Sequence, residues 1–326
     1  MKEKNKGIKL RDLVEGFLFS LQAEGRARAT HEYYYGKLKY LLMYAANENW
    51  PYQVESIDSN HIRQFLSWVG SRSFEYVAGN GSRRSIKAKP CTAWRYYRAL
   101  RRLFNWAIEE GLLRTNPLKG IHFKTPPPPP IEPYGVEELK RLLSVCELDI
   151  KTGTCFTGLR NKALLLLFID TAARLSEVAQ LRLSDLNLEQ KCIRVIGKGG
   201  KVGVCPFSAK TAKAIWLYLL ERKHRAKTDA LWVTEEGKPF SASGISSCFL
   251  RLKVRAGVNS HGRLHRLRHT SALQYLRGAK DSFLLQLFLR HEDLTMSRRY
   301  TQGLKAEEAI EAHRNGASPV EGLGLE

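Results

Sequence analysis

Five consecutive prolines at positions 126–130 constrain the fold of this chain more than any other feature of it. Proline fixes φ and lacks a backbone N–H, so such a run should form a stiff spacer and neither a helix nor a central strand. A chain of 326 residues also exceeds what one hydrophobic core commonly serves. We therefore expect two domains, 1–125 and 134–326, joined by a proline-rich linker over 126–133.

The part before the prolines is predicted to be entirely helical. Apolar residues recur there at helical spacing in four segments, over 10–21, 33–46, 62–69 and 94–108. Asp58 and Thr92 stand where N-caps would stand, and Gly111 follows the last segment as a stop signal.

The part after the prolines has a mixed pattern. Helices are predicted over 136–146, 161–170, 176–181, 209–222, 243–256, 264–276, 283–289 and near 294–300. Two alternating segments, 192–196 and 202–206, predict strands joined by a glycine-rich hairpin connection. The predicted fold class is mainly α, with a mixed α+β second domain that is mostly helical and has a small antiparallel sheet.

The charge of the chain points to an anionic partner. Lys and Arg number 53 against 32 Asp and Glu, a formal net charge of +21. Residues 1–130 contain 22 basic and 11 acidic residues, or +11, which leaves +10 for the remainder. Two cationic domains suit a polyanion gripped from both sides, with affinity drawn from phosphate contacts and counterion release. Charge that only keeps the protein soluble is the alternative.

Two segments of the first part are candidate DNA contacts. The last predicted helix carries arginines at three- and four-residue spacing, which form one cationic stripe while the aromatic residues of this helix face the core. The stripe consists of Arg95, Arg98, Arg101 and Arg102. A flexible loop over 79–90 carries Arg83, Arg84, Lys87 and Lys89, and DNA contact or a solvated turn explains it equally well.

Composition argues against a metal site, a disulfide framework and a membrane span. The six cysteines are scattered without a CxxC pair, so we expect small core residues and neither a zinc site nor a disulfide framework. No apolar run reaches membrane-spanning length, and the first residues lead into no signal-peptide hydrophobic region. The expected location is the cytoplasm.

Arg174 is the first candidate for chemistry. It follows an apolar segment and small residues, immediately before the next predicted helix. Its planar guanidinium suits bidentate contact with a phosphate and keeps its charge at every physiological pH. An internal ion pair with Glu177 or Asp170 explains the position equally well. Glu177 is interpreted as structural, orienting the arginine or a helix end.

Five further residues carry reactive groups, each ambiguous alone. His265 and Arg268 share one helical face, so both can approach one anion. Lys198 stands in a glycine-flanked hairpin tip, where it reaches a substrate oxygen or remains a solvated lysine. His291 precedes a short polar break, where structural histidines are common. Tyr300 lies beside two arginines, which favour a phenolate, although surface tyrosines often have such neighbours.

Taken in order, these residues resemble the tyrosine recombinase (phage integrase) family, most closely its compact Xer-like members. That family carries an Arg-x-Ser-Glu box, a Gly-Lys-Gly-x-Lys hairpin, a His-x-Leu-Arg-His box, and a Leu-Gly-His box followed nine residues later by a tyrosine. The matching segments here are Arg174–Glu177, Gly197–Lys201, His265–His269, Leu289–His291 and Tyr300. The match spans roughly residues 136–301. A helical, SAM-like core-binding domain ahead of it is also what the family leads one to expect.

Two positions depart from the family pattern without removing a reacting group. Ala172 stands where the family usually has glycine before the arginine, and Arg290 replaces the glycine before His291. Arg290 either tightens phosphate binding or alters how the Tyr300 segment is held.

The resemblance implies a mechanism. Arg174 and Arg268 bind the nonbridging oxygens of a scissile phosphate while Tyr300 attacks it, leaving a 3′-phosphotyrosyl enzyme and a free 5′-hydroxyl. Lys198 protonates the leaving oxygen, and His265 and His291 orient the phosphate and assist proton transfer. No cofactor, ATP or metal ion is implied, because the covalent link conserves the energy of the phosphodiester.

The resemblance also implies partners. These are double-stranded DNA recombination sites, bound by a homotetramer that is a monomer or dimer when free, with accessory DNA-bending or directionality proteins as further candidates. Strand exchange would pass through a Holliday junction, and the tail over 304–326 either docks on a neighbouring subunit or is untethered. Two rival functions are a noncatalytic DNA-binding protein on the same scaffold and a type IB topoisomerase-like nicking-closing enzyme. Integration, excision and dimer resolution all stay open.

Overall fold

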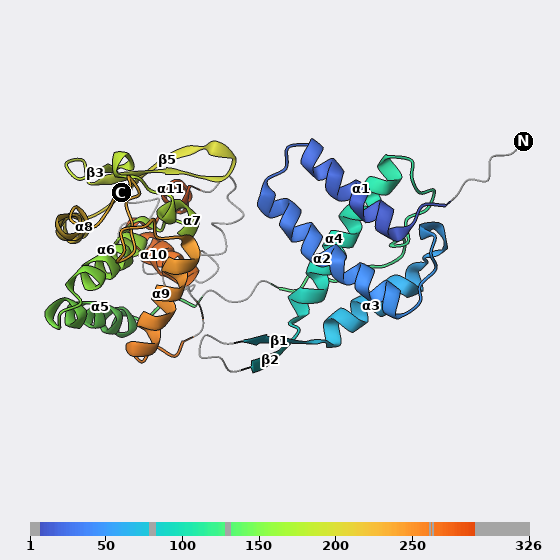
Figure 1. Cartoon of the computed structure of the whole chain (residues 1–326), viewed down its shortest axis with the longest axis horizontal. Helices are drawn as coiled ribbons and strands as arrows, with labels where there is room; N and C mark the ends of the chain where they lie inside the picture. Colours follow the sequence, from blue (N-terminus) through green and yellow to red (C-terminus); the bar gives the residue numbers. More distant parts are fainter. Residues whose placement is uncertain (1–6, 78–82, 128–131, 261, 263, 291–326) are drawn as a thin grey trace, which may run out of the picture. The chain divides into compact units, whose positions relative to one another are not determined.

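The computed structural model describes residues 7–77, 83–127, 132–260, 262 and 264–290 of the chain. The chain divides at the proline run into two compact units, residues 1–129 and 130–326. Each unit has a hydrophobic core of its own, and Figure 1 shows its helices and strands.

The described residues of the first unit form a small bundle of helices (Figure 1). Helix α4 packs against each of the other three because its apolar side chains follow a 3.6-residue period. The bounds are α1 Leu10–Ala23, α2 Arg28–Asn47, α3 Ser59–Ser71 and α4 Pro90–Glu109, with a 3-10 turn at Val54–Ser56. All four helices contain the segments that the sequence predicts to be helical.

The ends of these helices agree with the predicted signals in two of three cases. Asp58 caps α3 by accepting hydrogen bonds from the backbone N–H groups of Asn60 and His61. Gly111 follows α4 with a left-handed φ of +68°. The prediction for Thr92 is wrong, because α4 begins two residues earlier with Pro90 in its first turn, where a fixed φ favours helix initiation.

The prediction of an entirely helical first unit, with an irregular loop over 79–90, is also corrected. Strands β1 (Ser73–Val77) and β2 (Arg83–Lys87) form an antiparallel hairpin whose register pairs Ser73 with Lys87. The alternating apolar and polar residues of β1 carry this information, but five residues are too few to distinguish a strand from the end of α3.

The second unit is mostly helical with a three-stranded sheet (Figure 1). Its strands are antiparallel in the order β3-β4-β5, and β4 and β5 have the predicted bounds, whereas the two-residue β3 was not predicted. The strands are β3 Leu186–Asn187, β4 Cys192–Ile196 and β5 Val202–Pro206. The helices are α5 Val136–Lys151, α6 Cys155–Thr171, α7 Leu175–Ala179, α8 Ala209–Arg222, α9 Ala242–Arg255, α10 Leu264–Ala279 and α11 Ser282–Leu289. The helix predicted near 294–300 lies outside the described residues.

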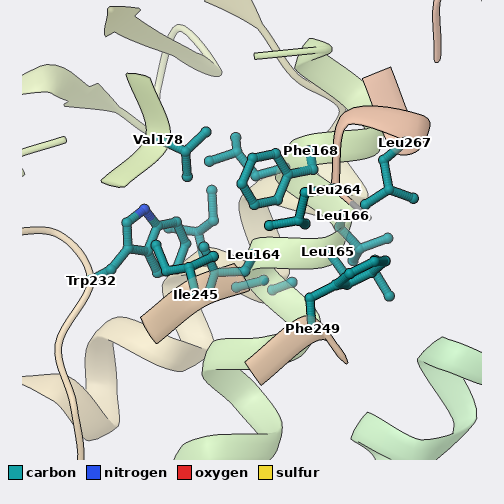
Figure 2. Packing of buried hydrophobic residues seen from close by; sticks show 14 of the residues in the cluster. Leu164, Leu165, Leu166, Phe168, Val178, Trp232, Ile245, Phe249, Leu264 and Leu267 are labelled. Carbon is teal, nitrogen blue, oxygen red and sulfur yellow. The ribbon is translucent and has the colours of Figure 1, made fainter. Parts of the chain in front are cut away.

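Helix α6 is the centre of the second core. It is apolar on nearly all sides because it packs against α5, α8 and α10. Figure 2 shows Leu164, Leu165 and Phe168 of this helix among Ile245 and Phe249 of α9 and side chains from the start of α10. The core therefore fixes the end of α6 and the beginning of α10, where two candidate site segments start.

The cysteines match the prediction in part. Among the described residues all six are free thiols, but only Cys146 and Cys205 are buried. The other four are partly exposed, so a core role fits two of the six.

Candidate active site

Arg174 is positioned by a sharp reversal between α6 and α7. Helix α6 ends at Thr171, and Ala172 then adopts a left-handed conformation with φ of +49°. The Thr171 hydroxyl accepts a hydrogen bond from the backbone N–H of Ala173 and stabilises the turn. Arg174 thus becomes the N-cap residue of α7, with 42% of its side chain exposed. Ala172, one of the two departures from the family pattern, occupies a conformation that glycine adopts most easily.

The carboxylate of Glu177 lies at the centre of the site. Its Oε1 accepts from Nη1 of Arg174 at 2.7 Å, and its Oε2 accepts from the Arg174 backbone N–H at 2.8 Å. Only 3% of the Glu177 side chain is exposed. The structure therefore contains the ion pair with Glu177 and leaves Arg174 accessible, so the two explanations for Arg174 do not exclude each other. Asp170 instead accepts hydrogen bonds from Ser208 and Thr211.

Glu177 stays ionised because its hydrogen bonds outweigh its burial. Burial alone would raise the pKa of this carboxyl. The backbone and side-chain hydrogen bonds from Arg174, and the charges of Arg290 and Arg174, lower the pKa below its ordinary value of 4.5. A buried carboxylate with two cationic neighbours results.

The β4–β5 hairpin approaches the same carboxylate. A methyl group added at Gly197 would lie 3.9 Å from Oε1 of Glu177. The next residue is Lys198, whose backbone begins a 3-10 turn that Gly199 and Gly200 complete with positive φ angles. The backbone N–H of Gly197 donates to the carbonyl of Lys201 at 2.7 Å and closes the hairpin. The hairpin tip that carries Lys198 is therefore anchored beside Glu177.

Helix α10 contributes Arg268 and His265. The Arg268 side chain is buried, and its guanidinium donates to the carbonyl oxygens of Ala172 and, at 2.7 Å, Leu289. Arg268 thus joins the turn before Arg174 to the end of α11. His265 is exposed on α10, and its ring meets the ring of His269 edge-on at 4.5 Å between centroids.

A second set of hydrogen bonds holds the start of α10. Nζ of Lys253 donates to the carbonyl oxygens of Ser260 and Gly262 at 2.6 and 2.9 Å. The Tyr134 hydroxyl also donates to the Gly262 carbonyl, at 3.0 Å. Nη2 of Arg266 donates to the Pro133 carbonyl at 2.8 Å. As expected from its spacing, Arg266 points away from Arg268 and serves structure.

Arg290 is a component of the site whose role the sequence left open. It ends α11 with a left-handed φ of +53°. Its Nη2 donates to Oε2 of Glu177 at 3.0 Å, and 17% of its side chain is exposed. The signal in the sequence was an arginine where a glycine is usual, but a partner 113 residues away cannot be inferred from one chain.

Arg174, Arg290 and the β4–β5 hairpin thus meet at Glu177, and the buried Cys205 lies near the same charges. Burial raises the pKa of the Cys205 thiol to about 11, and Arg290, Glu177 and Arg268 all lie close enough to act on it electrostatically. His291 and Tyr300 lie outside the described residues, as do 304–326.

The phage integrase family matches residues 135–307 of the chain, which is more than half of it. The SAM-like domain of phage integrases matches residues 10–125. This chain belongs to the phage integrase family, the tyrosine recombinases.

The relatives of the recombinase cover most of its length. The tyrosine recombinase XerC of Oceanobacillus iheyensis is 29% identical over 300 residues, 90% of this chain and 92% of that protein. The Tn1549 transposon integrase, solved with a circular intermediate DNA, covers 95% of this chain and all of that one, with 15% identity and a TM-score of 0.72. A lambda integrase tetramer bound to a Holliday junction covers 92% of this chain and 80% of its own, with 18% identity and a TM-score of 0.68. The family assignment makes the protein a site-specific recombinase, and the solved structures share its fold.

The first unit of the recombinase presents the predicted arginine stripe on its surface. A hollow on α4 is lined by all four arginines together with Tyr33, Tyr34, Trp94 and Asn105. The aromatic residues of α4 differ in their surroundings. Tyr96, Phe104 and Trp106 are buried. The Trp94 ring instead lies against Arg98, with 4.9 Å between its centroid and the guanidinium carbon. The prediction that all of these aromatics face the core is therefore wrong for Trp94.

An adjoining hollow extends this cationic surface toward the proline run. It shares Trp94, Arg98 and Arg101 and adds His122 and Lys124, which belong to no sequence motif that would have singled them out. On the β1–β2 hairpin, Arg83 and Lys87 are exposed, as is Lys89 after it, and the Arg84 backbone pairs with Tyr76.

Within the described ranges, no helix is both long and apolar enough to cross a membrane. The same residues contain no group of three or more His, Cys, Asp or Glu side chains arranged to hold a metal ion.

Proposed function

We propose that this recombinase cuts and rejoins double-stranded DNA at specific sites through a covalent 3′-phosphotyrosyl bond at Tyr300. The observation that supports the proposal is that Arg174 and the Lys198 hairpin meet at the buried carboxylate of Glu177, while Arg268 binds the Ala172 carbonyl in the turn before Arg174. In the sequence, Tyr300 follows the end of α11 by eleven residues, within the segment that the family match includes.

Phosphoryl transfer requires mainly positioning and charge stabilisation, since the bonding changes occur at the phosphate. Arg174 and Arg268 stabilise the charge on the nonbridging oxygens of the scissile phosphate. The Tyr300 hydroxyl oxygen attacks the phosphorus in line, and the bond from phosphorus to the 5′-oxygen breaks. Lys198 donates a proton to that oxygen, while His265 and His291 orient the phosphate and take up the phenol proton.

The reverse reaction restores a phosphodiester bond to a new 5′-hydroxyl. Because the phosphotyrosyl bond retains the energy of the original linkage, no ATP and no metal ion are required in this scheme. Arg174 and Arg268 suit the role because a guanidinium keeps its charge throughout the physiological pH range.

DNA affinity is assigned to the cationic surfaces. Arginines along α4 provide phosphate contacts, and Trp94 and Tyr33 supply flat surfaces beside them. The basic residues of the β1–β2 hairpin, Arg83, Arg84 and Lys87, together with Lys89, are assigned a second set of backbone contacts. Such contacts position a protein on DNA and carry no sequence information directly.

The assembly proposed is a tetramer on two recombination sites, because four strands must be exchanged. The lambda integrase tetramer bound to a Holliday junction supplies a solved arrangement with the same fold. Accessory DNA-bending or directionality proteins would join this assembly.

The test uses nicked suicide substrates tiled across the DNA that flanks the gene, incubated with wild type and with Tyr300→Phe. A nick close to the scissile bond lets the short leaving fragment diffuse away, so the covalent complex accumulates. We expect a protein–DNA adduct, resistant to heat and detergent, with wild type only.

A supercoiled plasmid that lacks the identified site separates the recombinase from a nicking-closing enzyme. The recombinase leaves the plasmid supercoiled, whereas site-independent relaxation would support the topoisomerase function. An adduct with neither protein on any substrate would leave only a noncatalytic DNA-binding protein.

A further inference from the structure

Arg290 places a second positive charge on the carboxylate that orients Arg174. Oε2 of Glu177 accepts from Nη2 of Arg290 at 3.0 Å, while Oε1 accepts from Nη1 of Arg174 at 2.7 Å. Glu177 and Arg290 are both largely removed from water, with 3% and 17% of their side chains exposed. Charges in such a setting are screened weakly, so each changes what its neighbours experience.

Arg290 changes the net charge of this buried group. Arg174 and Glu177 alone form a neutral pair, in which the carboxylate offsets the charge that Arg174 offers to an anion. With Arg290 the group of three carries a net charge of +1. The exposed part of Arg174 can then attract a phosphate while its buried side remains paired.

Gly203 of β5 leaves the space that the Arg290 side chain occupies. A methyl group added at Gly203 of β5 would lie 2.6 Å from Cδ of Arg290. Two carbon atoms cannot approach this closely without a shift of one of them, so the extended Arg290 conformation depends on the missing side chain at residue 203. Arg290 also adopts a left-handed backbone conformation, which glycine adopts more easily than arginine.

Arg290 is not needed simply to hold the end of α11. The carbonyl of Leu289 is bound by Arg268 at 2.7 Å, and the Arg290 backbone N–H donates to Leu287 at 3.0 Å. Leu285 and Leu289 anchor the helix by packing in a small apolar cluster. The Arg290 guanidinium adds one hydrogen bond to this end of the helix, from Nη1 to the Phe288 carbonyl at 3.3 Å, and its charged contact is the one to Glu177.

We propose that Arg290 is a positioning residue for Arg174. Arg290 shares the Glu177 carboxylate with Arg174, so the group of three keeps a net positive charge that Arg174 presents to the nonbridging oxygens of the scissile phosphate. This inference rests on the proposed function and goes beyond it by assigning a role to a residue that need not touch the DNA.

The experiment compares two suicide substrates that differ only at the scissile position, one with a phosphate and one with a neutral methylphosphonate. The methyl group removes one charged nonbridging oxygen, so there is less charge for an arginine network to stabilise. Single-turnover rates of adduct formation are measured for wild type, Arg290→Gln, Arg290→Lys and the control Arg277→Gln, which removes an exposed arginine of α10.

We expect Arg290→Gln to form the adduct more slowly than wild type, on the order of tenfold on the phosphate substrate and less than about twofold on the methylphosphonate. Arg290→Lys should recover much of the rate on phosphate, since it restores the charge, and Arg277→Gln should match wild type. Equal losses on the two substrates would overturn the proposal, because they indicate a merely structural role. No adduct with wild type would instead refute the proposed function.

Gly203→Ala tests the same inference without touching a charged residue. In wild type the added methyl displaces Arg290, so the substrate-dependent loss should reappear. In an Arg290→Gly background the same change should lower the rate of adduct formation by less than about twofold, because no side chain at residue 290 occupies the space beside residue 203. Equal effects of Gly203→Ala in both backgrounds, with thermal unfolding confirming folded proteins, would contradict the proposed contact.

Discussion

At the scale of single residues, the site depends on a carboxylate held away from water. Glu177 receives a backbone N–H and a guanidinium from Arg174 and a second guanidinium from Arg290. Breaking a buried pair by removing one partner commonly destabilises a protein by about 3–5 kcal/mol, because the remaining charge loses its compensation. Removing the negative charge at residue 177 should therefore be costly.

Glu177→Gln is expected to lower the free energy of unfolding by about 3 kcal/mol at neutral pH, since two arginines then face each other without a carboxylate. Urea denaturation followed by circular dichroism measures it. Glu221→Gln, which removes a partly exposed ion pair with Arg225, should change stability by less than about 1 kcal/mol. Equal losses in the two variants would contradict the role of burial.

The difference in unfolding free energy between wild type and Glu177→Gln should depend on pH. The folded state lowers the pKa of Glu177 below its ordinary value of 4.5. The carboxylate therefore contributes stability above that value, and the contribution is lost as pH falls through the lower folded-state pKa. Wild type and Glu177→Gln should accordingly converge in stability as the pH falls below 4.5. A gap that stays constant down to the folded-state pKa would argue against an ionised Glu177.

The sequence and the structure differ most at this scale. The family resemblance was readable from the order of six candidate residues, because their local motifs are short and self-contained: Arg174, Lys198, His265, Arg268, His291 and Tyr300. The pairing of Arg290 with Glu177 was not predictable, since it joins residues 113 apart and depends on how α11 packs against α10. Whether Trp94 faces the core or the arginines likewise depends on neighbouring helices.

At the scale of elements, the site depends on how α10 begins. Its start is held by Lys253 from α9 and by Tyr134 ahead of α5, both of which donate to the Gly262 carbonyl. These hydrogen bonds hold the segment just ahead of His265, and packing of α10 against α6 holds the helix itself.

Lys253→Met is expected to slow adduct formation, because the Ser260 carbonyl loses the Lys253 donor, the Gly262 carbonyl keeps only the Tyr134 hydroxyl, and the start of α10 shifts. Thermal unfolding should show a decrease in stability of about 2 kcal/mol. Lys213→Met, at an exposed position of α8, is the matched control and should leave both quantities unchanged. Wild-type rates in Lys253→Met would mean that this lysine does not position His265.

Secondary structure was predictable wherever a segment buried one face. The strands at 192–196 and 202–206 were located to the residue because their alternation and the glycines between them are unambiguous. The β1–β2 hairpin was not found, because a cationic segment rich in Ser and Gly is also typical of a loop. Helix α4 was placed correctly, but Pro90 and not Thr92 marks its beginning.

At the scale of the whole molecule, a net charge of +21 is distributed over both units. The arginines of α4 are gathered around one hollow, where their mutual repulsion favours a bound anion. We therefore expect the affinity for DNA to fall with salt concentration in proportion to the number of phosphates that these arginines contact.

Arg98→Gln/Arg101→Gln should reduce the slope of log affinity against log salt concentration by about 0.9 for each DNA phosphate that the variant no longer neutralises. Binding to a duplex that contains the site is measured by fluorescence anisotropy across a salt series. The control Arg114→Gln/Lys119→Gln removes two exposed charges outside the hollow. If the control lowers the slope equally, net charge and not the stripe governs binding.

The proposed mechanism requires that Tyr300 become covalently linked to DNA in a site organised by Arg174 and Arg268. The most direct measurement is peptide mapping by mass spectrometry of the adduct trapped on a suicide substrate. We predict a single modified peptide in which Tyr300 carries the 3′-phosphate of the cleaved strand, together with a released strand that has a free 5′-hydroxyl. DNA attached to any other residue, or joined through a 5′-phosphate, would contradict this mechanism.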